Sequence, residues 1–196
     1  MKSPVVLVGL GEMGGTFARG LLRAGYPVYP ATRDTDLAEL ARGLPTPELV
    51  LVAVAENDLH SVLEQLPPAW FRRIGLLQNE LLPRDYRHFH GVTVISVWFE
   101  KKKGQDVKVL IPSPAFGPRA KLLAKALATL DIPVKLVDSP RDMLLELVVK
   151  NLYILTTNIA GLRTGGTVAE LWADHRPFAE AVANEVISLQ EGLTGK

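Results

Sequence analysis

The chain of 196 residues contains no cysteine, which excludes disulfides, thiolate metal sites and cysteine nucleophiles. It also has no excess of one charge, because 22 Lys and Arg residues balance 21 Asp and Glu residues to a net charge of +1. This balance indicates neither nucleic acid nor an acidic membrane as a partner. The histidines do not have the spacing of metal ligands, and we predict no metal site. They are His60, His88, His90 and His175.

Long apolar runs and a leader segment are also missing. No uninterrupted apolar stretch approaches the roughly 20 residues of a membrane span. The opening Met-Lys-Ser-Pro leads directly into an apolar strand, without the pattern of a signal peptide. With 47% hydrophobic and 22% charged residues, the chain can bury a core. We therefore expect a cytoplasmic protein of one large or two small domains.

The strongest motif that is present lies at the N-terminus. The apolar run 5–8 is typical of a buried parallel strand, and a helical pattern covers 13–24. Between them, Gly9, Gly11 and Gly14 have the G-x-G-x-x-G spacing. The first glycine permits a sharp turn, the second lets a pyrophosphate approach the backbone, and the third lets the helix pack against the strand.

This context of strand, glycine loop and helix predicts a dinucleotide site, with phosphates on the N–H groups at the helix N-terminus. The alternative is a tight turn that binds no ligand. A third strand, 48–54, supplies one more predicted contact, Val54. The predicted cofactor-binding residues of these segments are Gly9, Leu10, Gly11, Glu12, Met13, Gly14 and Val54.

The end of the second strand, 27–31, distinguishes between NADP and NAD. In dinucleotide-binding folds this strand end faces the adenosine ribose. Arg33 lies about 20 residues after the glycines, where a guanidinium can pair with the 2′-phosphate of NADP. The neighbouring Asp34 leaves NAD as an alternative cofactor, and the remaining alternative is that Arg33 is only a solvated surface arginine. We predict NADP as the favoured cofactor.

Strands and helices alternate along the rest of the first 138 residues. This alternation predicts an α/β fold with a Rossmann-type NAD(P)-binding sheet over 1–138, followed by a small, truncated all-helical domain over 139–196. We expect segments 92–97 and 107–111 to form an antiparallel hairpin around a lysine-rich turn, and 113–118 to be a rigid loop. The other expected elements are helices 37–42, 59–66 and 118–130 and strands 74–77 and 134–137.

Asn79 follows the fourth strand directly. Ligands of open α/β sheets lie beyond the carboxyl ends of the strands, so this asparagine is predicted to lie near the nicotinamide and the substrate. The alternative is an asparagine that only forms a turn.

The helical part begins with a helix over 140–162 that is apolar nearly all round, which predicts packing in a core or a dimer. Lys150, Ile154 and Asn158 share one stripe of this helix. An ammonium on this stripe can donate to the oxygen of a carbonyl that receives hydride, and an asparagine can bind the substrate. The alternative is a snorkelling lysine and a buried asparagine bonded to backbone.

Together these motifs resemble the ketopantoate reductase (2-dehydropantoate 2-reductase) family. The resemblance rests on the glycine loop, Leu77-Gln-Asn79, the segment 138–142, the Lys150–Asn158 spacing and the segment 166–171. It implies that Arg33 holds the 2′-phosphate, that Asn79 lies near nicotinamide and substrate, that Lys150 is catalytic and that Asn158 binds substrate.

The chain departs from the family pattern at several positions. Ala55 replaces a lysine that the family commonly places near the NADP phosphate, Glu80 stands where a glycine often follows the asparagine, and Ile154 replaces a second asparagine. The family's later helices supply a serine and a glutamate that have no match here.

Two functions remain open on the sequence. The first is reduction of a small 2-keto acid by NADPH, with Lys150 stabilising the carbonyl oxygen and the apolar helix forming a homodimer. The second is a dinucleotide-binding or regulatory protein without catalytic activity. Another dehydrogenase of the β-hydroxyacid type is a third, weaker interpretation.

Overall fold

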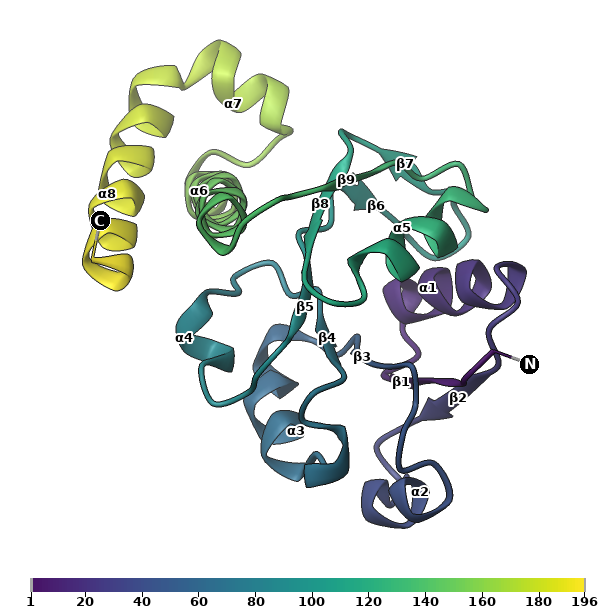
Figure 1. Ribbon diagram of the computed structural model, residues 1–196. Coiled ribbons are helices and arrows are strands. Elements are labelled where there is room, and N and C mark those ends of the chain that lie inside the picture. Colours follow the sequence, from purple (N-terminus) through teal and green to yellow (C-terminus); the bar gives the residue numbers. More distant parts are fainter. Residues whose placement is uncertain (1, 196) are drawn as a thin grey trace.

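The computed structural model describes residues 2–195 and contains one mixed sheet of seven strands (Figure 1). Neighbouring strands from β2 to β5 are parallel, β8 is antiparallel to β5, and β9 is parallel to β8. In spatial order the strands are β2 (Val28–Ala31), β1 (Val5–Val8), β3 (Leu49–Val52), β4 (Ile74–Leu76), β5 (Thr93–Ile95), β8 (Ser113–Phe116) and β9 (Val134–Leu136).

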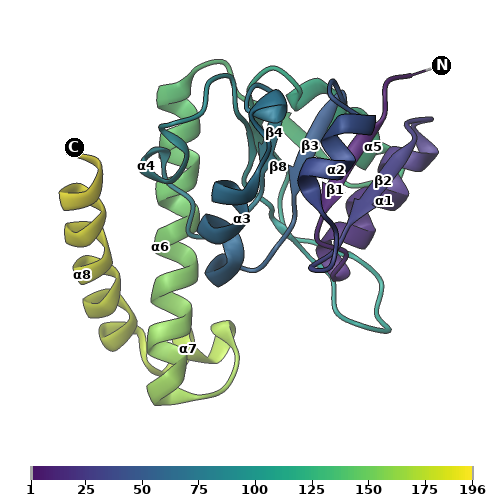
Figure 2. The same cartoon turned by 90° about the horizontal axis from the view of Figure 1, so that it is seen from below.

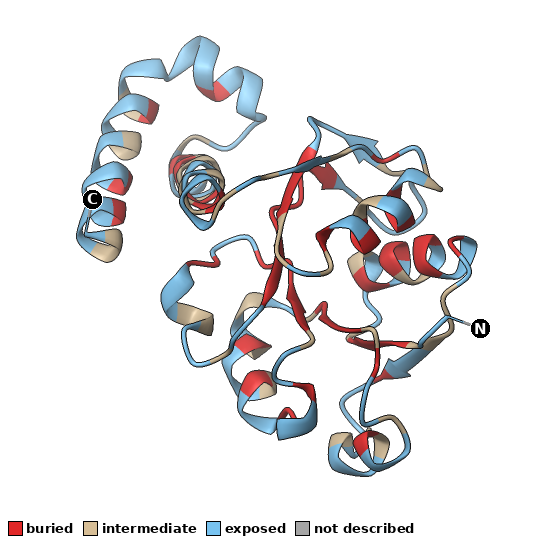
Figure 3. Ribbon diagram, viewed as in Figure 1, coloured by how far each residue is buried: buried red, intermediate tan, exposed pale blue. Residues whose placement is uncertain are grey.

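The central strands are buried on both faces. All four residues of β1 and of β3 are buried, as the continuous apolar runs of these segments predict for a parallel sheet. Figure 3 shows this burial concentrated at the centre of the sheet. The prediction of an α/β fold with a Rossmann-type sheet and following helices is therefore confirmed.

Helices cover both faces of the sheet. One core contains Phe17 and Leu21 of α1 and Leu123 of α5, and the opposite core contains Leu63 of α3 and Leu147 of α6. The helices are α1 (Glu12–Arg23), α2 (Leu37–Gly43), α3 (Leu59–Gln65), α4 (Pro83–Tyr86), α5 (Ala120–Ala128), α6 (Pro140–Thr164), α7 (Val168–Asp174) and α8 (Arg176–Thr194), with 3-10 turns at Glu56–Asp58 and Pro68–Trp70.

The long helix α6 connects the sheet to the C-terminal helices. The Ser139 hydroxyl caps it by accepting from the Asp142 backbone N–H, and Gly165 ends it with a φ of 66°. Figure 2 shows α6 between the sheet and α8. By length and composition α6 could cross a membrane, but it carries the buried polar residues Lys150 and Asn151 and packs on both the sheet and α8. We treat it as a core helix.

The prediction that 113–118 forms a loop is wrong, because Ser113–Phe116 forms strand β8 inside the sheet. Proline is normally excluded from the interior of a sheet because it has no N–H to donate. Pro114 is accepted here because it contributes its carbonyl, which receives the Ser96 backbone N–H at 2.8 Å. Because β8 contains a single proline, only one backbone donor is lost.

The predicted hairpin is also corrected. Residues Thr93–Ile95 belong to the main sheet, and the hairpin consists of β6 (Phe99–Glu100) and β7 (Lys108–Val109), which form a separate two-stranded sheet. The chain leaves the main sheet after Ile95, and the Ser113 hydroxyl accepts from the Trp98 backbone N–H at 2.9 Å. The hairpin therefore extends beyond the carboxyl ends of the parallel strands, beside the glycine loop.

Candidate functional site

The glycine loop has a backbone that only glycine fits at two positions. Gly9 has a φ of +93°, and a Cβ there would lie 2.5 Å from the Ala53 carbonyl oxygen. A Cβ on Gly14 would lie 2.2 Å from the Gly9 carbonyl oxygen. Both distances are well below any real contact, so these glycines let α1 begin directly against β1 and β3.

Gly11 has a different role, because a Cβ built on it meets no atom within 4 Å. Its lack of a side chain therefore serves no packing need within the described residues. Helix α1 starts at this residue, which provides no side-chain cap for the first-turn N–H groups. Open space in front of uncapped N–H groups fits the pyrophosphate of a dinucleotide.

Two cavities of about 520 Å³ each lie beside this loop. They share the lining residues Gly11, Ala53, Val54 and Ala55, so the glycine loop and the end of β3 separate them. A dinucleotide has two halves joined by a pyrophosphate, and a pair of cavities that meet at the pyrophosphate position fits that shape.

The first cavity lies at the end of β2 and contains Arg33. The Arg33 side chain is 91% exposed, and its Nη2 lies 3.3 Å from Oδ2 of Asp58. The Thr32 backbone N–H donates to the Thr35 hydroxyl at 2.9 Å, which shapes the turn that presents the arginine. The guanidinium is therefore free on most of its surface and held loosely at one end by a carboxylate.

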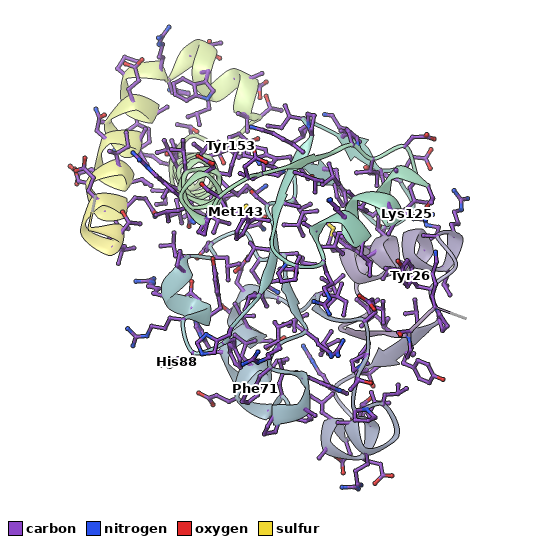
Figure 4. The ribbon with its side chains drawn as sticks, viewed as in Figure 1. Tyr26, Phe71, His88, Lys125, Met143 and Tyr153 are labelled. Atoms are coloured by element: carbon purple, nitrogen blue, oxygen red, sulfur yellow. The ribbon has the colours of Figure 1, made fainter. Side chains whose placement is uncertain are left out.

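The second cavity is formed by the ends of β3 and β4, the β6–β7 hairpin and α6. Met143 and Tyr153 lie along the side of α6 that faces the sheet (Figure 4). Of the predicted residues, this cavity brings together Gly11, Glu12, Met13, Val54, Asn79 and Lys150.

Lys150 is buried, with 6% of its surface exposed. Its Nζ donates to the Val97 carbonyl oxygen at 2.7 Å and lies 4.4 Å from the centroid of the Trp98 ring. The ring packs on Tyr153 with a centroid separation of 5.2 Å. Burial lowers the pKa of Lys150 to about 8, against the carboxylates of Glu100 and Glu56, which raise it.

Asn79 and Glu56 meet where β3 and β4 end. The Asn79 backbone N–H donates to the Glu56 carboxylate. Burial raises the pKa of Glu56; the Asn79 N–H lowers it, and the nearby carboxylates of Glu80 and Asp85 raise it. Asn79 is among the residues that line the second cavity.

The structure does not bring Asn158 into this cavity. Asn158 is exposed, and the contribution of α6 to the lining ends at Ile154. Asn158 lies one helical turn, or about 6 Å, beyond Ile154, where α6 has already passed the edge of the cleft. Asn158 therefore does not line this cavity together with Lys150 in the described structure, and its role in substrate binding stays a prediction.

Asn151, on the same helix, has a structural role. Its amide nitrogen donates to the carbonyl oxygens of Leu81 at 3.3 Å and Leu147 at 3.1 Å, in a buried position. It therefore ties α6 to the segment after β4, and it does not line the cavity.

The sequence interpretation missed three charged residues of the two cavities: Asp58, Glu56 and Glu100. The rule that selected Asn79 applies equally to Glu56, which follows β3 closely. Glu100 could not be placed this way because it lies on the hairpin, whose strands were assigned to the wrong segments.

The sheet, the glycine loop and the paired cavities define the fold of an NAD(P)-binding domain that is followed by helices. The solved 2-dehydropantoate 2-reductase of Methylococcus capsulatus superposes with a TM-score of 0.69 at 15% identity, over 93% of this chain and 72% of that one. The enzyme of the same name from Geobacter metallireducens gives 0.66 at 18% identity, over 96% and 75%.

A Plasmodium falciparum pyrroline carboxylate reductase, solved with NADP bound, gives a TM-score of 0.50 at 14% identity, over 97% of this chain and 76% of that one. No protein-family model matches the sequence, and no curated protein matches it. The predicted resemblance is confirmed at the level of fold: the chain has the ketopantoate reductase architecture over nearly its whole length and spans about three quarters of the length of those proteins.

Proposed function

We propose that the protein binds NADPH and reduces the carbonyl group of a small molecule. The observation that supports this most strongly is the cavity that extends from the glycine loop to Lys150. It brings a buried ammonium within the same space as the open face of Gly11. The resemblance implies a 2-keto acid as the substrate class.

Lys150 is suited to protonate the carbonyl oxygen. A nicotinamide held in this cavity would supply the hydride, and Lys150 would stabilise the negative charge that then grows on the oxygen. The Val97 carbonyl orients the ammonium, and a pKa of about 8 keeps Lys150 mostly protonated at neutral pH while making it a better proton donor than an ordinary lysine. The proton that Lys150 gives to the oxygen is replaced from water.

Arg33 supports NADP over NAD as the cofactor. Its guanidinium lies at the end of β2, lines the first cavity and has most of its surface free. A guanidinium can bind a phosphate with two parallel hydrogen bonds. Asp58, the one described ion-pair partner of this guanidinium, lines the same cavity.

The second candidate function is dinucleotide binding without turnover. The observation that favours it is Ile154, an apolar side chain in the cavity where the family resemblance would have an asparagine. Loss of substrate-binding amides would leave the cofactor cavities intact.

Steady-state NADPH oxidation with a panel of small ketones and keto acids tests the proposal. We expect Lys150→Met to lower kcat by about a hundredfold to ten-thousandfold, as for removal of a positioned proton donor, with NADPH affinity within about threefold of wild type. Lys125→Met, which removes an exposed lysine from α5, is the matched control and should leave kcat unchanged. Tight NADPH binding without oxidation by any carbonyl compound would favour the second candidate function.

A further inference from the structure

The charges that line the second cavity suit a different substrate from the one that the resemblance implies. Four acidic or basic side chains line this cavity: Glu12, Glu56, Glu100 and Lys150. Glu12 is offset by Lys101, whose Nζ lies 3.4 Å from its carboxylate. Two carboxylates therefore remain against one ammonium.

To reduce a keto acid, Lys150 would have to use its N–H donors for two groups at once, the carboxylate and the carbonyl oxygen. One of its three N–H donors is already used by the Val97 carbonyl oxygen. Lys150 is the one cationic side chain among the described lining residues. The carboxylate of a keto acid would therefore lie near Glu56 and Glu100, with only the remaining donors of Lys150 to bind it.

The neutral polar groups do not supply the missing partner. Gln78 is buried and already bonded, with its amide nitrogen on the Val52 and Val54 carbonyl oxygens and its amide oxygen accepting from the Leu77 backbone N–H. The Asn79 side chain is a neutral amide, which can bind an ammonium through its oxygen as well as a carboxylate through its nitrogen.

We infer that Glu56 and Glu100 determine substrate specificity, and that the reducible compound is a small aminoketone rather than the anion of a 2-keto acid. This inference rests on the proposed function. The substrate's ammonium group lies against the two carboxylates, and its carbonyl oxygen faces Lys150. Hydride from NADPH adds to the carbonyl carbon, the C=O π electrons move to oxygen, and Lys150 gives that oxygen a proton, so that an amino alcohol and NADP⁺ result.

The environment of Glu56 fits a cationic ligand. Burial raises the pKa of Glu56, and the nearby carboxylates of Glu80 and Asp85 raise it further. An ammonium group placed beside Glu56 would relieve both effects, whereas a carboxylate would add a third like charge.

Calorimetric binding to the NADPH-loaded protein tests the inference independently of turnover. The probes are two products of similar size, isopropanolamine and lactate. We expect isopropanolamine to bind at least about tenfold more tightly than lactate, which is the scale of one nearby charge in a partly buried site. In the Glu56→Gln/Glu100→Gln double variant this ratio should fall by about tenfold or more. Glutamine retains a side-chain oxygen that can accept the Asn79 backbone N–H, so the loop keeps its hydrogen bond in this variant.

Glu64→Gln is the matched control, because it removes the same charge from an exposed position of α3 outside the cavity, and it should leave the ratio unchanged. Equal or tighter binding of lactate, or an unchanged ratio in the double variant, would overturn the inference. NADPH oxidation with aminoacetone and with pyruvate then separates the two proposals. Preferred oxidation of pyruvate overturns the inference and retains the reductase. Oxidation of neither ketone contradicts the reductase, while the binding ratio still decides the specificity.

Discussion

Lys150 combines two properties that are normally in conflict, burial and charge. A buried ammonium is costly unless it has partners, and this one has the Val97 carbonyl, the Trp98 ring and the charges of Glu56 and Glu100. A lysine that only snorkelled would extend to solvent. Lys150 instead ends inside a cavity that also contains the glycine loop, which is the arrangement that a proton donor for hydride transfer requires.

The pH dependence of turnover follows from the pKa of Lys150. Proton donation needs the ammonium form, and the pKa of about 8 means that this form is lost as pH rises through that value. We therefore expect kcat/KM for carbonyl reduction to be level below about pH 7 and to fall tenfold per pH unit well above pH 8. Initial rates of NADPH oxidation across this range measure it. A rate that rises through the same range would contradict the role of Lys150 as the acid.

We propose that Arg33 sets the choice between NADPH and NADH. We expect Arg33→Ala to weaken NADPH binding by about tenfold to a hundredfold, because the charge-assisted bonds to the 2′-phosphate are lost, and to change NADH binding by less than about twofold. Fluorescence titration with both cofactors measures the difference. Arg42→Ala, at an exposed position of α2 outside the first cavity, is the control. Equal losses for NADPH and NADH would remove the assignment of Arg33.

Single residues could be predicted from the sequence where a local rule fixes their position. The places of the glycines and Asn79 follow from the strand ends, whereas the helical stripe of Lys150 left a snorkelling lysine open and its proposed role came from the resemblance. Asn158 has the same helical periodicity as Lys150 but lies outside the cavity, because its position depends on where α6 passes the edge of the cleft. Helical spacing gives the direction in which a side chain leaves the helix axis, but it does not show which other elements that side chain faces.

At the scale of the elements, the glycines in the turn from β1 into α1 can be divided into those that packing requires and those that it does not. Gly14 is required by the close contact with the Gly9 carbonyl, whereas Gly11 and Gly15 meet no atom within 4 Å of a built Cβ. Gly11 faces both cavities and Gly15 faces neither. The same helix therefore offers three alanine substitutions with three distinct expected outcomes.

We expect Gly11→Ala to fold normally, since its φ of −63° suits alanine, and to lose at least about tenfold in NADPH affinity because the methyl group occupies the pyrophosphate position. Gly15→Ala should retain both stability and affinity. Gly14→Ala should lower Tm by more than about 5 °C, because α1 must move away from β1. Thermal melts and NADPH titration distinguish the three. A Gly11→Ala variant that binds NADPH normally would contradict the pyrophosphate assignment.

The order of helices and strands along the chain could be predicted more completely than the pairing of the strands in the sheet. The buried runs of β1 and β3 are local signals, and the structure confirms them. Strand β8 contains Pro114 and is held by its partners β5 and β9, so its sequence alone resembles a loop. The hairpin was assigned to the wrong residues for the same reason, because strand pairing is a long-range property.

At the scale of the whole molecule, α6 and α8 leave apolar side chains at the surface. Leu145, Val149 and Ile159 of α6 are 63%, 44% and 46% exposed and lie on one stripe of the helix. Ile187 of α8, which lines a groove together with Leu145, adds to an exposed apolar surface of the kind that marks an interface. We propose that this surface forms a homodimer, as expected from the apolar helix.

We expect the protein to sediment as a dimer at micromolar concentration and Leu145→Glu to sediment as a monomer, because a buried charge without a partner is costly at an interface. Leu22→Glu is the control, since Leu22 is 57% exposed on α1, away from this surface. Analytical ultracentrifugation gives the result directly. A wild-type monomer at all concentrations would contradict the proposed homodimer.

The binding of NADPH at the glycine loop is the claim on which the other proposals depend. Isothermal titration of the wild-type protein with NADPH, and with NADH in parallel, tests it most directly. The structure predicts one site per chain, saturated at micromolar NADPH, with NADH at least about tenfold weaker because it lacks the phosphate that Arg33 would bind. Absence of heat and of any change in Tm with either cofactor at millimolar concentration would contradict the dinucleotide site.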